Sequence, residues 1–282
     1  MKRPDILYDA YIFDLDGTVY LGDTLLPGAG ETIRRLRALS RRTLFLSNNP
    51  TRTRRAYAER LTALGLPTPV EDVVNSSSVM VDFLQRRMPG ARLFVIGERS
   101  LQEELVAGGF TLAGGGAAVE AVIASFDRTF DYGKLQIAFD AIRAGARFFA
   151  TNADRYCPVP GGGQPDAAAM IAAVEACTGA TVEAVVGKPS RYMAEAILAL
   201  VDAPPERCLM IGDRLETDVL LGLNNGMDAA LVLTGATSQA EAVASSIAPT
   251  YVLESLADLL PAALQARTTR EPERNEDPLS GV

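Results

Sequence analysis

Apolar and polar residues alternate along this 282-residue chain in two different rhythms. Short apolar runs predict buried strands, whereas longer stretches with apolar residues at helical spacing predict amphipathic helices. Toward the two ends of the chain, the predicted strands are 11–16, 43–49, 72–77, 207–213 and 229–235, and the predicted helices are 28–40, 52–64 and 215–224. Strands and helices that follow one another in this way indicate a mostly parallel sheet with helices on both faces.

The middle of the chain has its own set of predicted elements. They are strands at 92–100, 120–126 and 147–154 and an alanine-rich helix at 166–177. Stretches rich in glycine and proline at 108–118 and 158–165 predict loops. This part is therefore expected to form a second α/β unit inserted into the first. The tail at 267–282 is polar and charged, which predicts disorder.

Composition narrows the possible chemistry, because the chain contains no histidine. Catalysis by a serine or cysteine activated by histidine is excluded, and so are zinc sites with histidine ligands. Acid–base catalysis falls to Asp, Glu, Lys, Tyr or Cys. Any catalytic metal is expected to be a hard ion with oxygen ligands, with Mg²⁺ as the first choice.

Charge and cysteine content exclude two further classes of protein. The net charge of −8 and the pI near 4.8 argue against a nucleic-acid-binding protein. The three cysteines, Cys157, Cys177 and Cys208, are scattered and odd in number, which predicts a reduced, cytoplasmic protein without a disulfide framework. Cys177 and Cys208 lie on predicted apolar faces and are expected in the core. We identify neither a signal peptide nor an apolar run long enough to span a membrane.

Two aspartates stand at the end of the first predicted strand, in FDLDGTVY (13–20). Asp14 and Asp16 are two residues apart, so on a continuous strand both carboxylates point toward one side. Ligands of parallel sheets bind beyond the carboxyl ends of the strands, and Gly17 permits a tight turn close to a ligand. The alternative is an ordinary Asp-Gly turn in solvent. The apolar residues before the pair and Thr18 after it favour a functional site.

A second acidic pair occurs in IGDRLETD (211–218). Asp213 follows a predicted buried strand, as Asp14 does, and Asp218 lies about one helical turn further on. The alternative role is stabilisation of a helix N-terminus, where acidic residues are favourable. That alternative suits Glu216 best and Asp213 least.

Three further residues are candidates for binding an anion. Lys188 lies between glycine and proline in VVGKPS (185–190), and Ser47 and Asn48 end the second predicted strand. Beside four carboxylates, Lys188 would be a fixed positive charge that holds a phosphate, whose oxygens Ser47 and Asn48 could also bind. The alternatives are an ordinary surface lysine and capping of the following helix by Ser47 and Asn48.

Together these segments resemble the four motifs of the haloacid dehalogenase-like phosphohydrolases. The motifs are DLDGT, LSNN, VVGKPS and GDRLETD, in that order and at predicted strand ends. The long insertion between the second and third motifs resembles the α/β cap of the NagD-like subclass. Strings such as LSNNPTR (46–52), ATNADR (150–155) and GMDAALVLTG (226–235) are similar to the sugar-phosphate phosphatases of bacterial arabinose operons. The resemblance extends from about Tyr8 to Leu264.

The resemblance implies an α/β fold with a Rossmann-like parallel-sheet core and an inserted α/β cap. The core would comprise residues 1–78 and 182–266, and the cap residues 79–181. The resemblance also implies a homodimer formed through the cap.

The resemblance assigns a role to each candidate residue. Asp14 would be the nucleophile that forms an aspartyl-phosphate, and Asp16 the general acid and base. Mg²⁺ would be bound by Asp14, by the main-chain carbonyl of Asp16 and by Asp213, with support from Asp218. The groups implied to bind the transferring phosphoryl group are Ser47, Asn48 and Lys188.

The cap is implied to select the substrate through the loop Arg155, Tyr156 and Cys157. Arg155 and Tyr156 could hydrogen-bond sugar hydroxyls, with loop packing as the alternative for Tyr156. Related pyridoxal phosphate phosphatases carry histidine where Cys157 stands, which argues against that substrate. Cys157 is not expected to be a nucleophile, because no base or cationic partner can be named for it. Asp127 is a weaker candidate at the interface between cap and core.

The sequence thus predicts a Mg²⁺-dependent phosphatase for small phosphorylated metabolites, with sugar phosphates favoured and no nucleic-acid or membrane partner. A nucleotide, phosphoglycolate or glycerol-phosphate phosphatase on the same scaffold is an alternative. A phosphate- or Mg²⁺-binding protein without turnover is another, although such a protein would not need Asp16. No G-x-G-x-x-G motif follows the first strand, which argues against a dinucleotide-dependent dehydrogenase.

Overall fold

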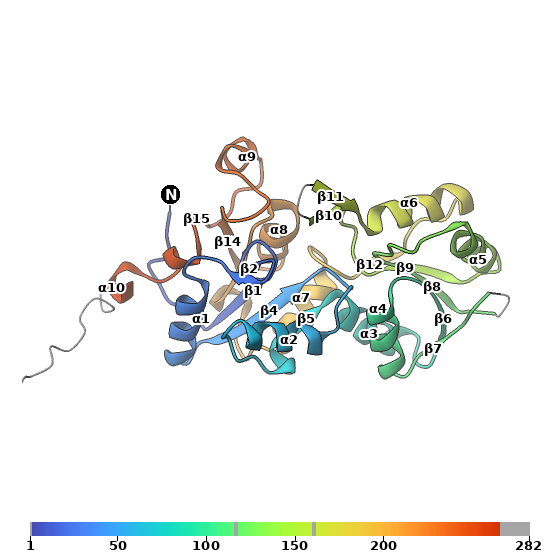
Figure 1. Ribbon diagram of the computed structural model, residues 1–282, viewed down its shortest axis with the longest axis horizontal. Coiled ribbons are helices and arrows are strands. Elements are labelled where there is room, and N and C mark those ends of the chain that lie inside the picture. Colours follow the sequence, from blue (N-terminus) through green and yellow to red (C-terminus); the bar gives the residue numbers. More distant parts are fainter. Residues whose placement is uncertain (1, 116–117, 160–161, 266–282) are drawn as a thin grey trace, which may run out of the picture.

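The computed structural model describes residues 2–115, 118–159 and 162–265, and the tail at 267–282 lies outside these ranges. Two parallel sheets lie side by side in it (Figure 1). The first sheet has the strand order β15-β14-β13-β1-β4-β5, and each of its neighbouring pairs is parallel. Its strands are β1 (Ala10–Asp14), β4 (Arg42–Ser47), β5 (Val73–Asn75), β13 (Cys208–Gly212), β14 (Asp228–Val232) and β15 (Tyr251–Leu253).

Helices cover both faces of this first sheet, as the alternation of elements predicts. Successive residues of a strand point to opposite faces, so Ile12 and Phe13 of β1 belong to two different hydrophobic clusters. The cluster of Ile12 includes side chains from α3, α7 and α8, and the cluster of Phe13 includes side chains from α1 and α2. The helices of this unit are α1 (Ala29–Ala38), α2 (Arg54–Ala63), α3 (Ser76–Arg87), α7 (Arg191–Leu198), α8 (Leu220–Asn224), α9 (Gln239–Ala244) and α10 (Ala262–Gln265).

The second sheet is built from the middle of the chain, in the strand order β12-β9-β8-β6-β7. Its neighbouring pairs are also parallel. The strands are β6 (Arg92–Ile96), β7 (Thr111–Leu112), β8 (Ala121–Ala124), β9 (Arg147–Ala150) and β12 (Ala184–Val185). The helices around them are α4 (Arg99–Ala107), α5 (Tyr132–Arg143) and α6 (Ala167–Thr178). The predicted α/β core with an inserted α/β cap is therefore confirmed as the fold class.

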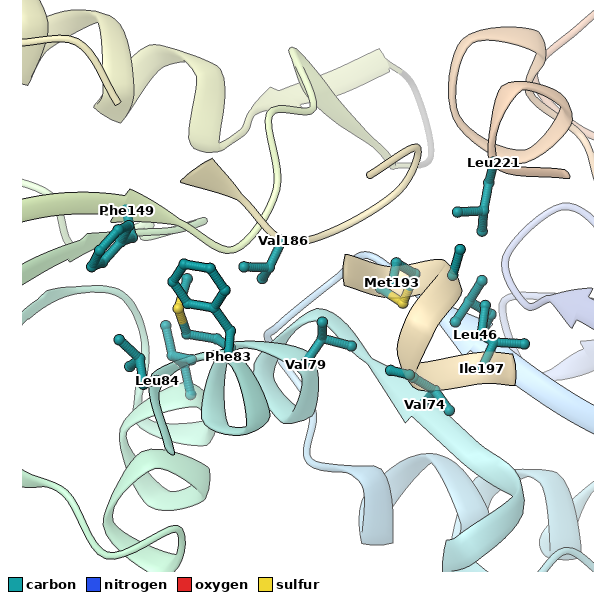
Figure 2. Close-up of a cluster of buried hydrophobic side chains, with 14 of the residues drawn as sticks. Leu46, Val74, Val79, Phe83, Leu84, Phe149, Val186, Met193, Ile197 and Leu221 are labelled. Carbon is teal, nitrogen blue, oxygen red and sulfur yellow. The ribbon is translucent and has the colours of Figure 1, made fainter. Parts of the chain in front are cut away.

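A single hydrophobic cluster joins the two units (Figure 2). Helix α3 contributes Val79 toward Met193 of the core and Phe83 toward Phe149 of the cap sheet. The Phe83 and Phe149 rings meet edge to face, with their centroids 5.1 Å apart. Because burial of such side chains is the main stabilising contribution to packing, this cluster fixes where the cap sits.

The structure differs from the sequence predictions at several places in the cap. Strand β7 lies inside the predicted loop 108–118, and α4 begins within the predicted strand 92–100. Residues 158–159 and 162–165 of the predicted loop belong to the antiparallel strands β10 (Tyr156–Val159) and β11 (Gly162–Pro165), which pair as a β-hairpin. Backbone hydrogen bonds between the two antiparallel strands hold this segment, although its content of glycine and proline predicts a loop. Strand β12 pairs with β9, so the cap sheet extends beyond the predicted boundary at residue 181.

The remaining elements are short. A second hairpin pairs β2 (Tyr20–Leu21) with β3 (Thr24–Leu25). Single 3₁₀ turns are η1 (Val70–Asp72), η2 (Pro205–Arg207) and η4 (Leu256–Asp258), and η3 (Leu215–Val219) is a π-helical turn.

Candidate active site

The first acidic pair lies where β1 ends, but only one of its members belongs to the strand. Asp14 is the last residue of β1, and Asp16 lies in the turn that follows. The predicted strand 11–16 therefore ends two residues earlier, and the two carboxylates do not project from one continuous strand. The chain turns because Tyr20 donates its N–H to Leu15, and Gly17 adopts a positive φ of 87° that suits glycine.

Three buried carboxylates converge at the adjacent ends of β1 and β13. Asp213 directly follows β13, and Asp218 lies in the π-helical turn η3, where a continuous helix is predicted. One oxygen from each of Asp14, Asp213 and Asp218 lies within 4.8 Å of the others. Lys188 reaches this cluster from the loop after β12, and its Nζ donates to Asp14 at 2.5 Å and to Asp218 at 2.6 Å. The structure thus brings together four candidate residues that are far apart in the sequence.

Charge in this cluster is unbalanced, because three carboxylates share one ammonium group. Burial strongly raises the pKa of Asp14, against the opposing effect of Lys188. Burial and the neighbouring Asp218 raise the pKa of Asp213 to about 6. For Lys188, burial opposes the charge, but Asp14 and Asp218 outweigh it and raise the pKa. Buried carboxylates without enough positive charge favour a bound cation.

The donor set fits a hard divalent metal ion, because it consists of carboxylate oxygens. Asp14, Asp213 and Asp218 could contribute ligands. Two glycines make room for Asp213. A Cβ atom at Gly17 or Gly235 would lie 2.5 Å or 2.0 Å from Oδ2 of Asp213, closer than side chains tolerate. The site therefore requires glycine at these two positions.

Capping does not account for the second acidic pair. Asp213 accepts the N–H of Ala236 at 2.6 Å, in the loop after β14. Asp218 accepts the N–H of Arg214 at 3.1 Å, which is a local helix-start contact, but its other oxygen faces Lys188. Stabilisation of a helix N-terminus thus explains one contact of Asp218. It does not explain Asp213, which contacts another loop.

Asp16 lies at the rim of the cluster and keeps an exposed surface. The surrounding protein withdraws part of the water from its carboxylate and raises its pKa, although Arg60 and Arg52 oppose this effect. A carboxyl group with a raised pKa retains a proton more readily near neutral pH, as a general acid must.

Ser47 and Asn48 do not cap the following helix, since Thr53 is the N-cap residue of α2. The Ser47 hydroxyl donates to Tyr57 and accepts the N–H of Asn49, both at 3.1 Å. The Asn48 side chain bonds to the Lys188 loop and to Asp154 of the cap. Phosphate binding by Ser47 and Asn48 stays a prediction.

Two of the cap residues named by the sequence, Tyr156 and Cys157, contact residues of the core. The Tyr156 ring is 5.6 Å from the guanidinium carbon of Arg214, and Cys157 Sγ accepts a hydrogen bond from Asn49 Nδ2 at 3.6 Å. The side chain of Arg155 is exposed. Burial raises the pKa of Cys157 to about 11, which agrees with the expectation that it is not a nucleophile.

Outside the pocket, the structure places Cys177 and Asp127 elsewhere than the sequence predicts. Cys208 is buried as expected, but Cys177 is exposed, because α6 turns this position to solvent. Asp127 forms an ion pair with Lys134 at 2.5 Å and accepts from Thr129 at 2.7 Å. Both partners lie within the cap, so these contacts assign Asp127 to cap structure rather than to the interface.

Sequence reasoning missed two charged residues near the pocket. Burial opposes the charge of Arg214, but Asp213 and Asp154 raise its pKa, so it is a cation beside the carboxylates. Its place directly after Asp213 in the GDRLETD segment was an available signal. Asp154 is the last residue of the predicted cap strand 147–154 and lies in the string ATNADR, but neither feature indicates its contact with Asn48, which is 106 positions away.

Comparison with known proteins agrees with this arrangement. Residues 11–111 match the model of the haloacid dehalogenase-like hydrolases, and residues 185–259 match the HAD-hydrolase-like model. The sugar-phosphatase AraL of Bacillus subtilis is 39% identical over 248 residues, which cover 88% of this chain and 90% of that protein. The glycerol-3-phosphate phosphatase of Gallus gallus is 35% identical, with 90% of this chain and 91% of that protein covered.

Solved structures give the same result. The 4-nitrophenylphosphatase of Thermotoga maritima has a TM-score of 0.85 at 33% identity, and the match covers 89% of this chain and 95% of that one. A putative nagD protein has a TM-score of 0.82 at 32% identity, covering 88% and 96%. No helix in the described ranges is long and apolar enough to cross a membrane. The chain belongs to the haloacid dehalogenase-like hydrolases and, within them, to the NagD-like subclass.

Proposed function

We propose that this hydrolase is a phosphatase that cleaves small phosphate monoesters, and that Mg²⁺ is its metal. The observation that carries the proposal is the contact of Lys188 with both Asp14 and Asp218 inside a buried carboxylate cluster. An ammonium group held there can bind a phosphoryl group beside a carboxylate that is placed to react with it. When bound, Mg²⁺ would neutralise charge on the phosphoryl oxygens, held by Asp14, Asp213 and the main-chain carbonyl of Asp16, with Asp218 in support.

In the proposed reaction, a carboxylate oxygen of Asp14 attacks phosphorus while the bond from phosphorus to the alcohol oxygen breaks. Asp16 donates its proton to the departing alcohol. In the second step Asp16 takes a proton from water, whose oxygen attacks phosphorus and releases inorganic phosphate and free Asp14. The raised pKa of Asp16 supports the first of these proton transfers.

We propose sugar phosphates as the preferred substrates. The similarity to a sugar-phosphatase at 39% identity supports this choice. The exposed Arg155 and half-exposed Tyr156 offer polar groups for sugar hydroxyls. The similarity to a glycerol-3-phosphate phosphatase at 35% identity supports glycerol phosphate as the second candidate. Nucleotides and phosphoglycolate complete the set of substrates to be compared.

The test is release of inorganic phosphate by the purified protein from sugar phosphates, glycerol phosphate, nucleotides and phosphoglycolate. Turnover is expected with Mg²⁺ and should disappear with EDTA and return when Mg²⁺ is restored. Sugar phosphates should give the highest kcat/KM. Turnover that survives EDTA would overturn the metal assignment, and a higher kcat/KM for nucleotides would overturn the substrate class.

The expected dimer through the cap stays a prediction. Light scattering of the purified protein measures it directly. A monomer at the concentrations used for the activity assay would contradict it.

A further inference from the structure

Asn48 connects several segments that form the pocket. Its carbonyl oxygen Oδ1 accepts the Lys188 N–H at 2.7 Å, and its Nδ2 donates to the Lys188 carbonyl at 3.2 Å. Its main-chain carbonyl accepts the Ser76 hydroxyl at 2.6 Å. The side chain is nearly buried, at 9% exposure. Asn48 therefore fixes the backbone of the residue whose ammonium group holds Asp14 and Asp218.

The same amide group makes the contact with the cap. Nδ2 of Asn48 donates to Oδ2 of Asp154 at 2.9 Å, and Nδ2 of Asn152 donates to the same oxygen at 2.9 Å. Asn152 also donates to Asp166, the N-cap residue of α6, at 3.0 Å. The Asp154 carboxylate is thus held by the cap on one side and by the core on the other.

The chemistry of the partners fixes the orientation of the Asn48 amide. A carboxylate only accepts hydrogen bonds, so it requires the NH₂ end of the amide. The Lys188 N–H only donates, so it requires the oxygen end. Space is also limited, because a Cβ atom at Gly187 would lie 2.6 Å from Oδ1 of Asn48. Loss of the Asp154 carboxylate would remove the charge-assisted hydrogen bond that the NH₂ end of the Asn48 amide donates.

We propose that Asp154 is a positioning residue that ties the cap to the phosphate site through Asn48 and Lys188. The proposal rests on the proposed phosphatase function for its kinetic effect, although the contact itself can be tested without turnover. With the tie in place, the Tyr156–Cys157 strand stays against Arg214 and Asn49. Without it, a smaller fraction of molecules has this strand in place, and the apparent substrate affinity falls in proportion to that fraction.

The experiment compares Asp154→Ala with the wild type, using 4-nitrophenyl phosphate with Mg²⁺ as the substrate. A hydrogen bond to a charged group contributes about 1.5–3 kcal/mol, so kcat/KM should fall at least about tenfold. The change should appear mainly as a higher KM. Asp154→Asn keeps an oxygen that can accept from Asn48 and Asn152, and it should restore kcat/KM to within about threefold of the wild type.

A second readout is independent of activity. Cys157 lies where the cap contacts the core, next to the proposed Asp154–Asn48 link, and its thiol can be alkylated by N-ethylmaleimide. In a Cys177→Ser background, which removes the exposed thiol and leaves Cys208 buried, Asp154→Ala should raise the alkylation rate of Cys157 several-fold. If Asp154→Ala fails to fold, Asp154→Ser, whose hydroxyl is too short to replace the carboxylate contact with Asn48, takes its place with the same expectations.

Asp140→Ala is the matched control, because Asp140 is an exposed cap carboxylate that bonds only within α5 among its described contacts, to Gln136 at 3.0 Å. It should leave both readouts unchanged. An alkylation rate in Asp154→Ala equal to that of Asp140→Ala would overturn the proposed role of Asp154, whatever the two activities are. Absence of turnover in the wild type would instead contradict the proposed function, and the alkylation result would still decide the role of Asp154.

Discussion

The pocket at the strand ends and the cap hairpin beside it are built in opposite ways. In the pocket, Asp14, Asp218 and Lys188 are 8%, 1% and 5% exposed and are joined by short ion pairs. In the hairpin, Tyr156 is 50% exposed and rests against Arg214. Changing one member of a buried ion pair leaves an uncompensated charge, whereas exposed side chains change at little cost to stability. This difference suits a pocket that performs the reaction and a hairpin that discriminates among substrates.

Within the cap, Asp166 resembles the pocket carboxylates in its burial but not in its partners. It is as buried as the pocket carboxylates, at 3% exposure, but its described hydrogen-bond partners are the neutral groups of Asn152 and Ala167. Burial accordingly raises its pKa to about 6. Asp14 and Asp218 thus share a lysine partner in the pocket, whereas Asp166 is a helix cap whose described hydrogen-bond partners are neutral.

The largest effect is expected in the pocket, from Asp14→Asn. The amide is close in shape to the carboxylate but cannot attack phosphorus, so hydrolysis of 4-nitrophenyl phosphate should fall by at least about 10⁴-fold. Asp9→Asn is the control, because Asp9 lies just before β1 and pairs with Arg41 and Arg207 at the surface. Asp14→Asn activity within tenfold of the wild type would exclude Asp14 as the nucleophile.

A smaller effect, on stability, is expected from Asp166→Asn. The pKa of Asp166 is raised from 3.8 to about 6 in the folded protein, so ionisation costs folding free energy as pH rises through this interval. The amide carries no such cost but can still accept from Ala167 and Asn152. Relative to the wild type, the variant should therefore gain about 2 kcal/mol between pH 4 and pH 7 in urea unfolding. Asp131→Asn, at the exposed N-cap of α5, is the matched control, and an equal pH response of the two variants would contradict the expectation.

The smallest effect is expected in the hairpin, from Tyr156→Ala. Removing an exposed ring that rests on Arg214 should lower kcat/KM by about two- to fivefold, since such contacts contribute about 0.5–1 kcal/mol at exposed sites. The size of the loss should differ among substrates, because the hairpin is expected to contact the part that varies. Tyr132→Ala, which changes a 78% exposed cap tyrosine on α5, is the control. A uniform loss as large as that of Asp14→Asn would erase the distinction between pocket and hairpin.

Much of the fold could be predicted, because strand and helix periodicities are local properties of the chain. The buried strand β1 and its neighbour β13 were both evident as apolar runs that end in aspartate. The hairpin of β10 and β11 was not evident, since glycine and proline favour turns and the hairpin is held by cross-strand pairing. Strand β12 was missed for a related reason, because two residues carry no periodicity and the strand is defined by its pairing with β9.

The sequence by itself determined the chemical inventory of the site: aspartates at strand ends, one lysine between glycine and proline, and no histidine. Tertiary structure decided which of these groups meet. Lys188 contacts Asp14 across 174 positions, and Asn48 contacts Asp154 of the cap across 106. The physical reason is that residue type and spacing are fixed along the chain, whereas such contacts form only when the sheets pack through their shared hydrophobic cluster.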